Sequence, residues 1–217
     1  MLNSLNDDYR NGGWHTPVGF LIECLIHEMH QYKLIRDSNQ RKLEKLIDEN
    51  QDISEDDLHT FLSSEMYKED FMLDKCHLSL VIISCQVIES IINYIGVHKI
   101  GESFYKSNIE RSGITEKFSL ISLICCDEKI DNNCSLKKSI RFVFDKRNSF
   151  IHPKTKEIVW SNGKPNLPVN HDIGNDVDAI KKLFLELSLW IKKKFDSIIT
   201  ETYVEKLDEL KNFDLCG

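Results

Sequence analysis

Residues 72–98 form the most apolar segment of the chain, and they constrain the fold more than any other stretch. Apolar side chains nearly surround the helix expected here, as in the central helix of a bundle. Crossing a membrane would need a run of about 18 apolar residues, and polar residues interrupt this one. We therefore expect a buried helix of a soluble protein with no membrane partner. The interrupting residues are Ser84, Gln86, Glu89, Ser90 and Asn93.

The rest of the chain also shows helical periodicity. Apolar residues recur at spacings of three and four, which predicts further amphipathic helices. The 217 residues contain only nine glycines and four prolines, which favours long helices over many short strands. We predict an all-α fold, an up-and-down bundle over residues 71–217 preceded by an N-terminal helical extension over residues 1–70. The expected helices cover 18–35, 39–48, 54–66, 72–98, 116–126, 135–151, 175–198 and 203–210.

Residues 153–174 differ in composition from the helical segments around them. Three of the four prolines lie there, together with the turn pair Asn162-Gly163. Such a pair suits a tight turn, and the prolines limit the length of any strand. We expect a loop or short hairpin at about 153–174, folded over or beside the preceding helix.

The seven cysteines show no paired spacing of the kind that binds a metal. Most stand among apolar residues, which is typical of reduced, buried thiols in a cytoplasmic protein. The polar residues 1–10 contain no apolar run of the kind that opens an export signal. We expect a cytoplasmic protein with no cofactor.

The helix expected before Pro153 carries the most distinctive polar residues. Arg147 lies in line with an apolar stripe that should face packed protein, so its head group needs a partner or a function. Pro153 disfavours helical geometry at His152, so the helix should end there. Arg147, Asn148 and His152 are then expected to converge beside the last carbonyls of the helix. The stripe consists of Leu136, Ile140, Val143 and Ile151.

The same region is basic within an acidic chain. Residues 137–156 contain seven basic side chains and one acid, Asp145, whereas the formal net charge of the chain is −7. Such a patch can hold one or two phosphates, with Lys146 and Lys154 as supporting residues. Alternatively, it is a solvated helix face that complements the C-terminal dipole. The basic residues are Lys137, Lys138, Arg141, Lys146, Arg147, Lys154 and Lys156.

These residue types suit RNA cleavage without a metal. Histidine titrates near operating pH and can take the proton of the 2′-hydroxyl that attacks the phosphate. The planar guanidinium of arginine donates two hydrogen bonds to phosphoryl oxygens and stays charged. Asn148 can orient the imidazole or the phosphate without adding charge.

The arrangement from Arg147 to His152 resembles the Arg-x4-His motif of HEPN domains, including the polar residue after the arginine. The stretch Gln86–Asn93 is similar to the first core helix of that family. The resemblance implies an all-helical, metal-independent ribonuclease acting as a homodimer on RNA, with His152 as general acid and base, and Arg147 stabilising the phosphate. Glu89 would pair with Arg147 or orient His152. Members are often toxins or antiviral effectors, which implies an antitoxin or activator partner.

Other interpretations remain open. Arg10 and His15 match the same spacing, but they lie in a Gly-Gly turn with no helix beneath them. The chain is alternatively a non-catalytic HEPN-like module that binds a partner or a nucleotide. A third hypothesis is a helical metal-binding protein, because Glu23, His27 and His30 share one helix face at spacings that suit metal ligands.

Overall fold

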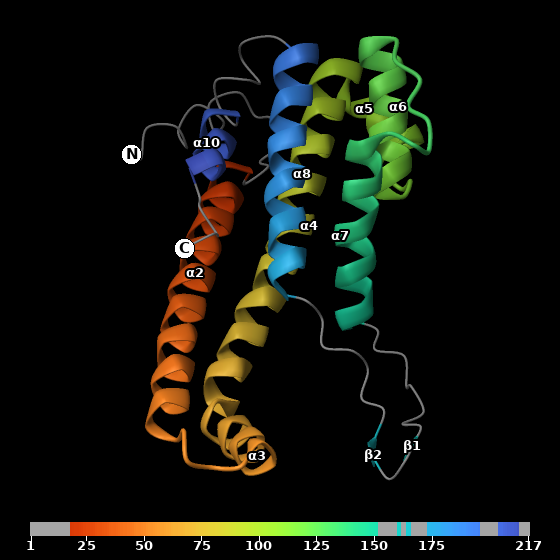
Figure 1. Cartoon of the computed structure of the whole chain (residues 1–217). Coiled ribbons are helices and arrows are strands. Elements are labelled where there is room, and N and C mark those ends of the chain that lie inside the picture. Colours follow the sequence, from red (N-terminus) through yellow and green to blue (C-terminus); the bar gives the residue numbers. More distant parts are fainter. Residues whose placement is uncertain (1–17, 152–159, 162–163, 166–172, 196–203, 213–217) are drawn as a thin grey trace.

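The computed structural model describes residues 18–151, 160–161, 164–165, 173–195 and 204–212. Helices dominate this part of the chain, so the predicted all-α class is confirmed (Figure 1). Two short strands, β1 (Trp160–Ser161) and β2 (Lys164–Pro165), pair antiparallel within the segment expected to be a loop or hairpin. The helices are α2 (Val18–Glu49), α3 (Glu55–Glu65), α4 (Tyr67–Ile100), α5 (Glu102–Asn108), α6 (Ile114–Cys126), α7 (Ser135–Ile151), α8 (Ile173–Lys194), α10 (Glu205–Asp208) and the 3-10 helix η2 (Glu209–Asn212).

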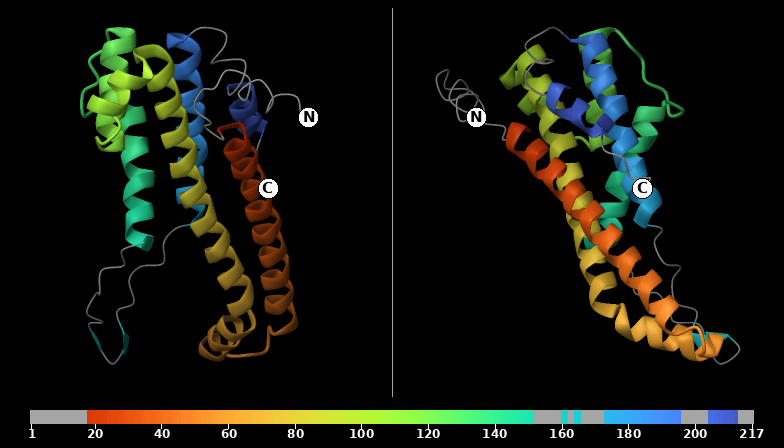
Figure 2. Two further views of the ribbon diagram at one scale, coloured as in Figure 1. Left: turned by 180° about the vertical axis from the view of Figure 1, so that it is seen from behind. Right: turned by 60° about the vertical axis from the view of Figure 1, so that its left-hand side comes forward.

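Helix α4 is the central element, as its composition predicts. Its first half packs against α2, and its second half is surrounded by α5 to α8 (Figures 1 and 2). Length and composition alone would let α4 cross a membrane, since an 18-residue window has a mean hydropathy of 1.8. The bundle buries 61% of that window, which is also the behaviour of a soluble protein's core helix. Its isoleucines at 88, 91, 92 and 95 are almost completely buried.

The prediction of two separate helices in the region of α2 was wrong. Two helices were expected at 18–35 and 39–48, but α2 runs without a break from Val18 to Glu49. Tyr32 and the apolar residues before it pack on α4, while Lys42 Nζ reaches Glu69 Oε1 of α4 at 2.7 Å. Contacts with α4 before and after the polar stretch therefore keep α2 helical between the two segments that were expected to be separate helices. The domain boundary expected at residue 70 falls inside α4, and α2 shares the core of the bundle.

Helices α7 and α8 lie beside the second half of α4, and their facing ends define the position of the site. Contacts of Cys85 with Val143 and of His77 with Phe150 show that α7 runs antiparallel to α4. The end of α7 and the start of α8 therefore extend beyond this half and lie level with His77, in the first half of α4.

Candidate functional site

Arg147 stands just before the last turn of α7, half-buried, with its guanidinium carbon 4.9 Å from the centroid of the Phe144 ring. Its Nη2 and Nε donate to Asn148 Oδ1 at 2.9 and 3.3 Å. Within the described part of the chain, no carboxylate forms an ion pair with Arg147. The geometry thus presents a positive group, oriented by a neutral amide and an aromatic ring, whose charge is neutralised by no acid among the described residues.

The apolar stripe of α7 explains where Arg147 lies. Ile140 and Val143 are fully buried, as predicted, and the arginine follows them on the same side of the helix. Ile151 was expected to complete the buried stripe, but its side chain is 51% exposed. The reason is that Phe150, one residue earlier, makes the inward contact with His77 at the end of α7.

Several predicted site residues lie outside the described residues. They are His152 and Lys154, and also Arg10 and His15 of the second motif match. The structure brings Arg147 and Asn148 together on α7, whereas their convergence with His152 stays a prediction.

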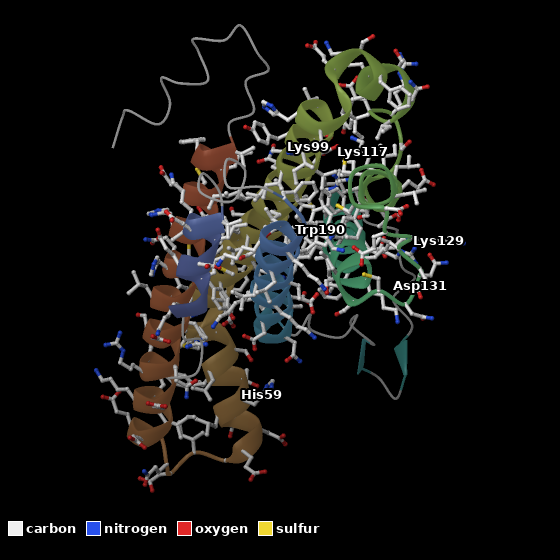
Figure 3. All side chains as sticks on the ribbon, turned by 90° about the horizontal axis from the view of Figure 1, so that it is seen from above. His59, Lys99, Lys117, Lys129, Asp131 and Trp190 are labelled. Carbon is white, nitrogen blue, oxygen red and sulfur yellow. The ribbon has the colours of Figure 1, made fainter. Side chains whose placement is uncertain are left out.

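Glu89 contacts α6 instead of Arg147. Its Oε1 lies 3.4 Å from Nζ of the buried Lys117, which is labelled in Figure 3. Lys117 also donates to Asn93 Oδ1 at 3.2 Å. Glu89 nevertheless lies near the candidate site. Both Glu89 and Arg147 are close enough to Cys85 to affect its thiol. Burial raises the pKa of Cys85 to about 12, while the charge of Arg147 lowers this pKa and the charge of Glu89 raises it further.

The structure adds two residues that sequence reasoning missed. His77 of α4 and Asp176, in the first turn of α8, are both buried, and His77 Nε2 lies 3.2 Å from Asp176 Oδ2. Lys146 Nζ lies 2.8 Å from the same oxygen. A sequence signal exists for both residues, because each is a titratable side chain on the apolar face of its helix, but spacing along the chain does not pair them.

The proposed metal-ligand residues of α2 do not gather around a common point. Glu23 pairs with Lys206 of α10, and His27 and His30 are exposed. Among the described residues, no three His, Cys, Asp or Glu side chains form a group suited to a metal ion. This geometry counts against the metal-binding hypothesis for α2.

Fold and site together define a broad class: an all-α bundle with a cationic side chain near the C-terminal end of a core helix. No family model, curated protein or solved structure matches the chain. Function therefore has to be inferred from the residues themselves.

Proposed function

We propose that this protein is a metal-independent endoribonuclease that acts as a homodimer, with Arg147 stabilising the phosphate and His152 serving as general acid and base. The observation that carries the proposal is the guanidinium of Arg147, which contacts an amide and an aromatic ring but no carboxylate in the described part of the chain. A buried or half-buried arginine usually has an acidic partner. A phosphodiester would supply the missing negative charge.

The surroundings of Arg147 suit a phosphate. Asn148 occupies Nε and Nη2 at one edge of the guanidinium, while the remaining donors can form the bidentate contact that phosphate oxygens accept. Lys138 and Arg141 are exposed in the preceding turns of α7 and add positive charge along the same helix. Lys146 is already paired with Asp176, so its expected role as a phosphate ligand is not part of the proposal.

One Arg147 and one His152 are too few groups for both proton transfers of RNA cleavage. A second copy of the chain, with its motif facing the first, supplies another histidine as the acid. Apolar side chains at this level of the bundle support such pairing, because Phe71, Leu78 and Ile151 are 60%, 37% and 51% exposed. Isologous pairing of one such face is the usual geometry of a homodimer.

The biological role follows from the proposed chemistry. An endoribonuclease in the cytoplasm has to be restrained, either by an antitoxin or by dependence on an activator. We place the chain among toxins or antiviral effectors on this basis, with RNA as the substrate.

The test is cleavage of labelled RNA by purified protein in EDTA. We expect the wild type to cleave, Arg147→Ala and His152→Ala to lose activity by roughly 100-fold or more, and the control Arg111→Ala, at an exposed position outside α7, to change it little. Equal cleavage by all four proteins would overturn the proposal. RNA binding that depends on Arg147 without any cleavage would instead identify a non-catalytic binding module.

A further inference from the structure

A buried charge cluster lies beside Arg147. Asp176 of α8 places one carboxylate oxygen 3.2 Å from His77 Nε2 of α4 and 2.8 Å from Lys146 Nζ of α7. The side chains of His77 and Asp176 are 3% and 7% exposed, and that of Lys146 is 22% exposed. The cluster therefore joins three helices in the layer where α7 ends and α8 begins.

Two aromatic residues of α7 contact members of this cluster, Phe142 with Lys146 and Phe150 with His77. The Lys146 ammonium lies 5.5 Å from the centroid of the Phe142 ring, one turn earlier. Phe150, one turn later, meets the His77 ring edge-on with their centroids 5.4 Å apart. Lys146 and Phe150 thus point towards α8 and α4, and this direction determines where Arg147, which follows Lys146, emerges.

The last turn of a helix needs such support. Its final carbonyls have no partner within the helix, so terminal turns open readily unless tertiary contacts hold them. Asp176 supplies one contact that reaches both neighbouring helices. Removing one partner of a buried ion pair leaves an uncompensated charge and is strongly destabilising.

We propose that Asp176, Lys146 and His77 are positioning residues that hold the last turn of α7 and so set the location of the Arg147 guanidinium. This inference rests on the proposed function for its consequence in catalysis. The three side chains act through the backbone of α7, whereas Arg147 contacts the phosphate.

Hydrogen exchange and RNA cleavage test the proposal on the full chain. Asp176→Asn should speed amide exchange at residues 147–151 by roughly tenfold or more while leaving α2 unchanged. It should also lower kcat by about 100-fold with a smaller change in KM. Asp178→Asn, at an exposed position two residues on, is the matched control. Should Asp176→Asn fail to fold, Lys146→Gln and the rescue Lys146→Arg replace it, with Lys193→Gln at an exposed position of α8 as their control.

The outcomes separate the two proposals. The positioning role is overturned if residues 147–151 exchange at the same rate in Asp176→Asn and Asp178→Asn. It is also overturned if they exchange at the same rate in Lys146→Gln and Lys146→Arg. Faster exchange with Arg147-dependent cleavage that falls in parallel supports it. If wild type and Arg147→Ala are equally inert on RNA, the proposed function fails, and the exchange comparison still decides whether the cluster holds the end of α7.

Discussion

The ring of Tyr105 fills the space that a side chain on Gly96 would occupy. A Cβ at Gly96 would lie 2.3 Å from Tyr105 Cε2 and 2.6 Å from Cδ2. The close approach lets Tyr105 reach Asn93, whose Oδ1 accepts from the tyrosine hydroxyl at 2.5 Å. The absence of a side chain at one position of α4 therefore fixes how α5 packs on it.

Gly96→Ala is expected to destabilise the protein by about 1–3 kcal/mol, because the Tyr105 ring is fully buried and has to shift. Urea denaturation measures the effect. Gly19→Ala is the control, since the nearest heavy atom to its Cβ would be Lys206 Nζ at 3.8 Å. That change should be neutral or slightly stabilising, because alanine favours a helix more than glycine does. Equal stability of the two variants would contradict the packing described for Gly96.

Asn93 should contribute more to stability than the buried Lys117 beside it. Asn93→Leu leaves the Tyr105 hydroxyl and the Lys117 ammonium without their shared acceptor, so we expect a loss of about 2–4 kcal/mol. Lys117→Met removes a buried charge, and its partner Glu89 is 44% exposed and can be hydrated. We expect that variant to lie within about 1 kcal/mol of wild type. Urea denaturation of both variants gives the comparison, and the reverse order would contradict it.

Arg147→Lys should retain the positive charge but lose the planar fork that binds two phosphate oxygens. We expect cleavage of labelled RNA to fall by about 100-fold while the folded stability stays near that of wild type. Thermal denaturation checks the stability. Full activity in the lysine variant would show that charge alone is sufficient and that bidentate contact is not required.

The proposed homodimer would have a mass in solution of twice the 25.3 kDa of one chain, which sedimentation analysis measures. Leu78→Glu places a charge on the apolar surface near the end of α7 and should weaken dimerisation by at least about tenfold. Leu34→Glu is the matched control, because Leu34 is 61% exposed on α2. A monomeric wild type at all concentrations would disprove the dimer.

Alkaline solution should destabilise the fold. Burial raises the pKa of Cys76 and Cys85 from 9.0 to about 12, and that of Tyr105 from 10.0 to about 12. The native state therefore holds these protons more tightly than the unfolded chain. Their contribution to the free energy of unfolding is complete below about pH 9 and is lost as the pH rises towards 12.

Urea midpoints followed upward from neutral pH measure this loss. Cys85→Ala should reduce the dependence of the midpoint on pH above about pH 9. Identical pH profiles of wild type and Cys85→Ala would contradict the effect assigned to Cys85.

The pattern of apolar residues along the sequence was sufficient to predict the central helix and which side of α7 is buried. Residues 72–98 are apolar on nearly all sides, and such a helix is stable only when other elements surround it. The stripe through Ile140 and Val143 placed Arg147 on the packed side of α7 because helical periodicity is a property of neighbouring residues. The half-buried arginine beside Asn148 agrees with that expectation.

Only the tertiary structure decided which polar groups meet. The continuity of α2 depends on contacts such as Lys42 with Glu69, and the pairing of Glu89 with Lys117 depends on how α6 packs on α4. His77 and Asp176 lie far apart along the chain, and no spacing rule brings them together. Periodicity tells which side of a helix is buried. The partner of a buried charge is determined by the packing between helices, because only a contact with another helix offsets the cost of removing that charge from water.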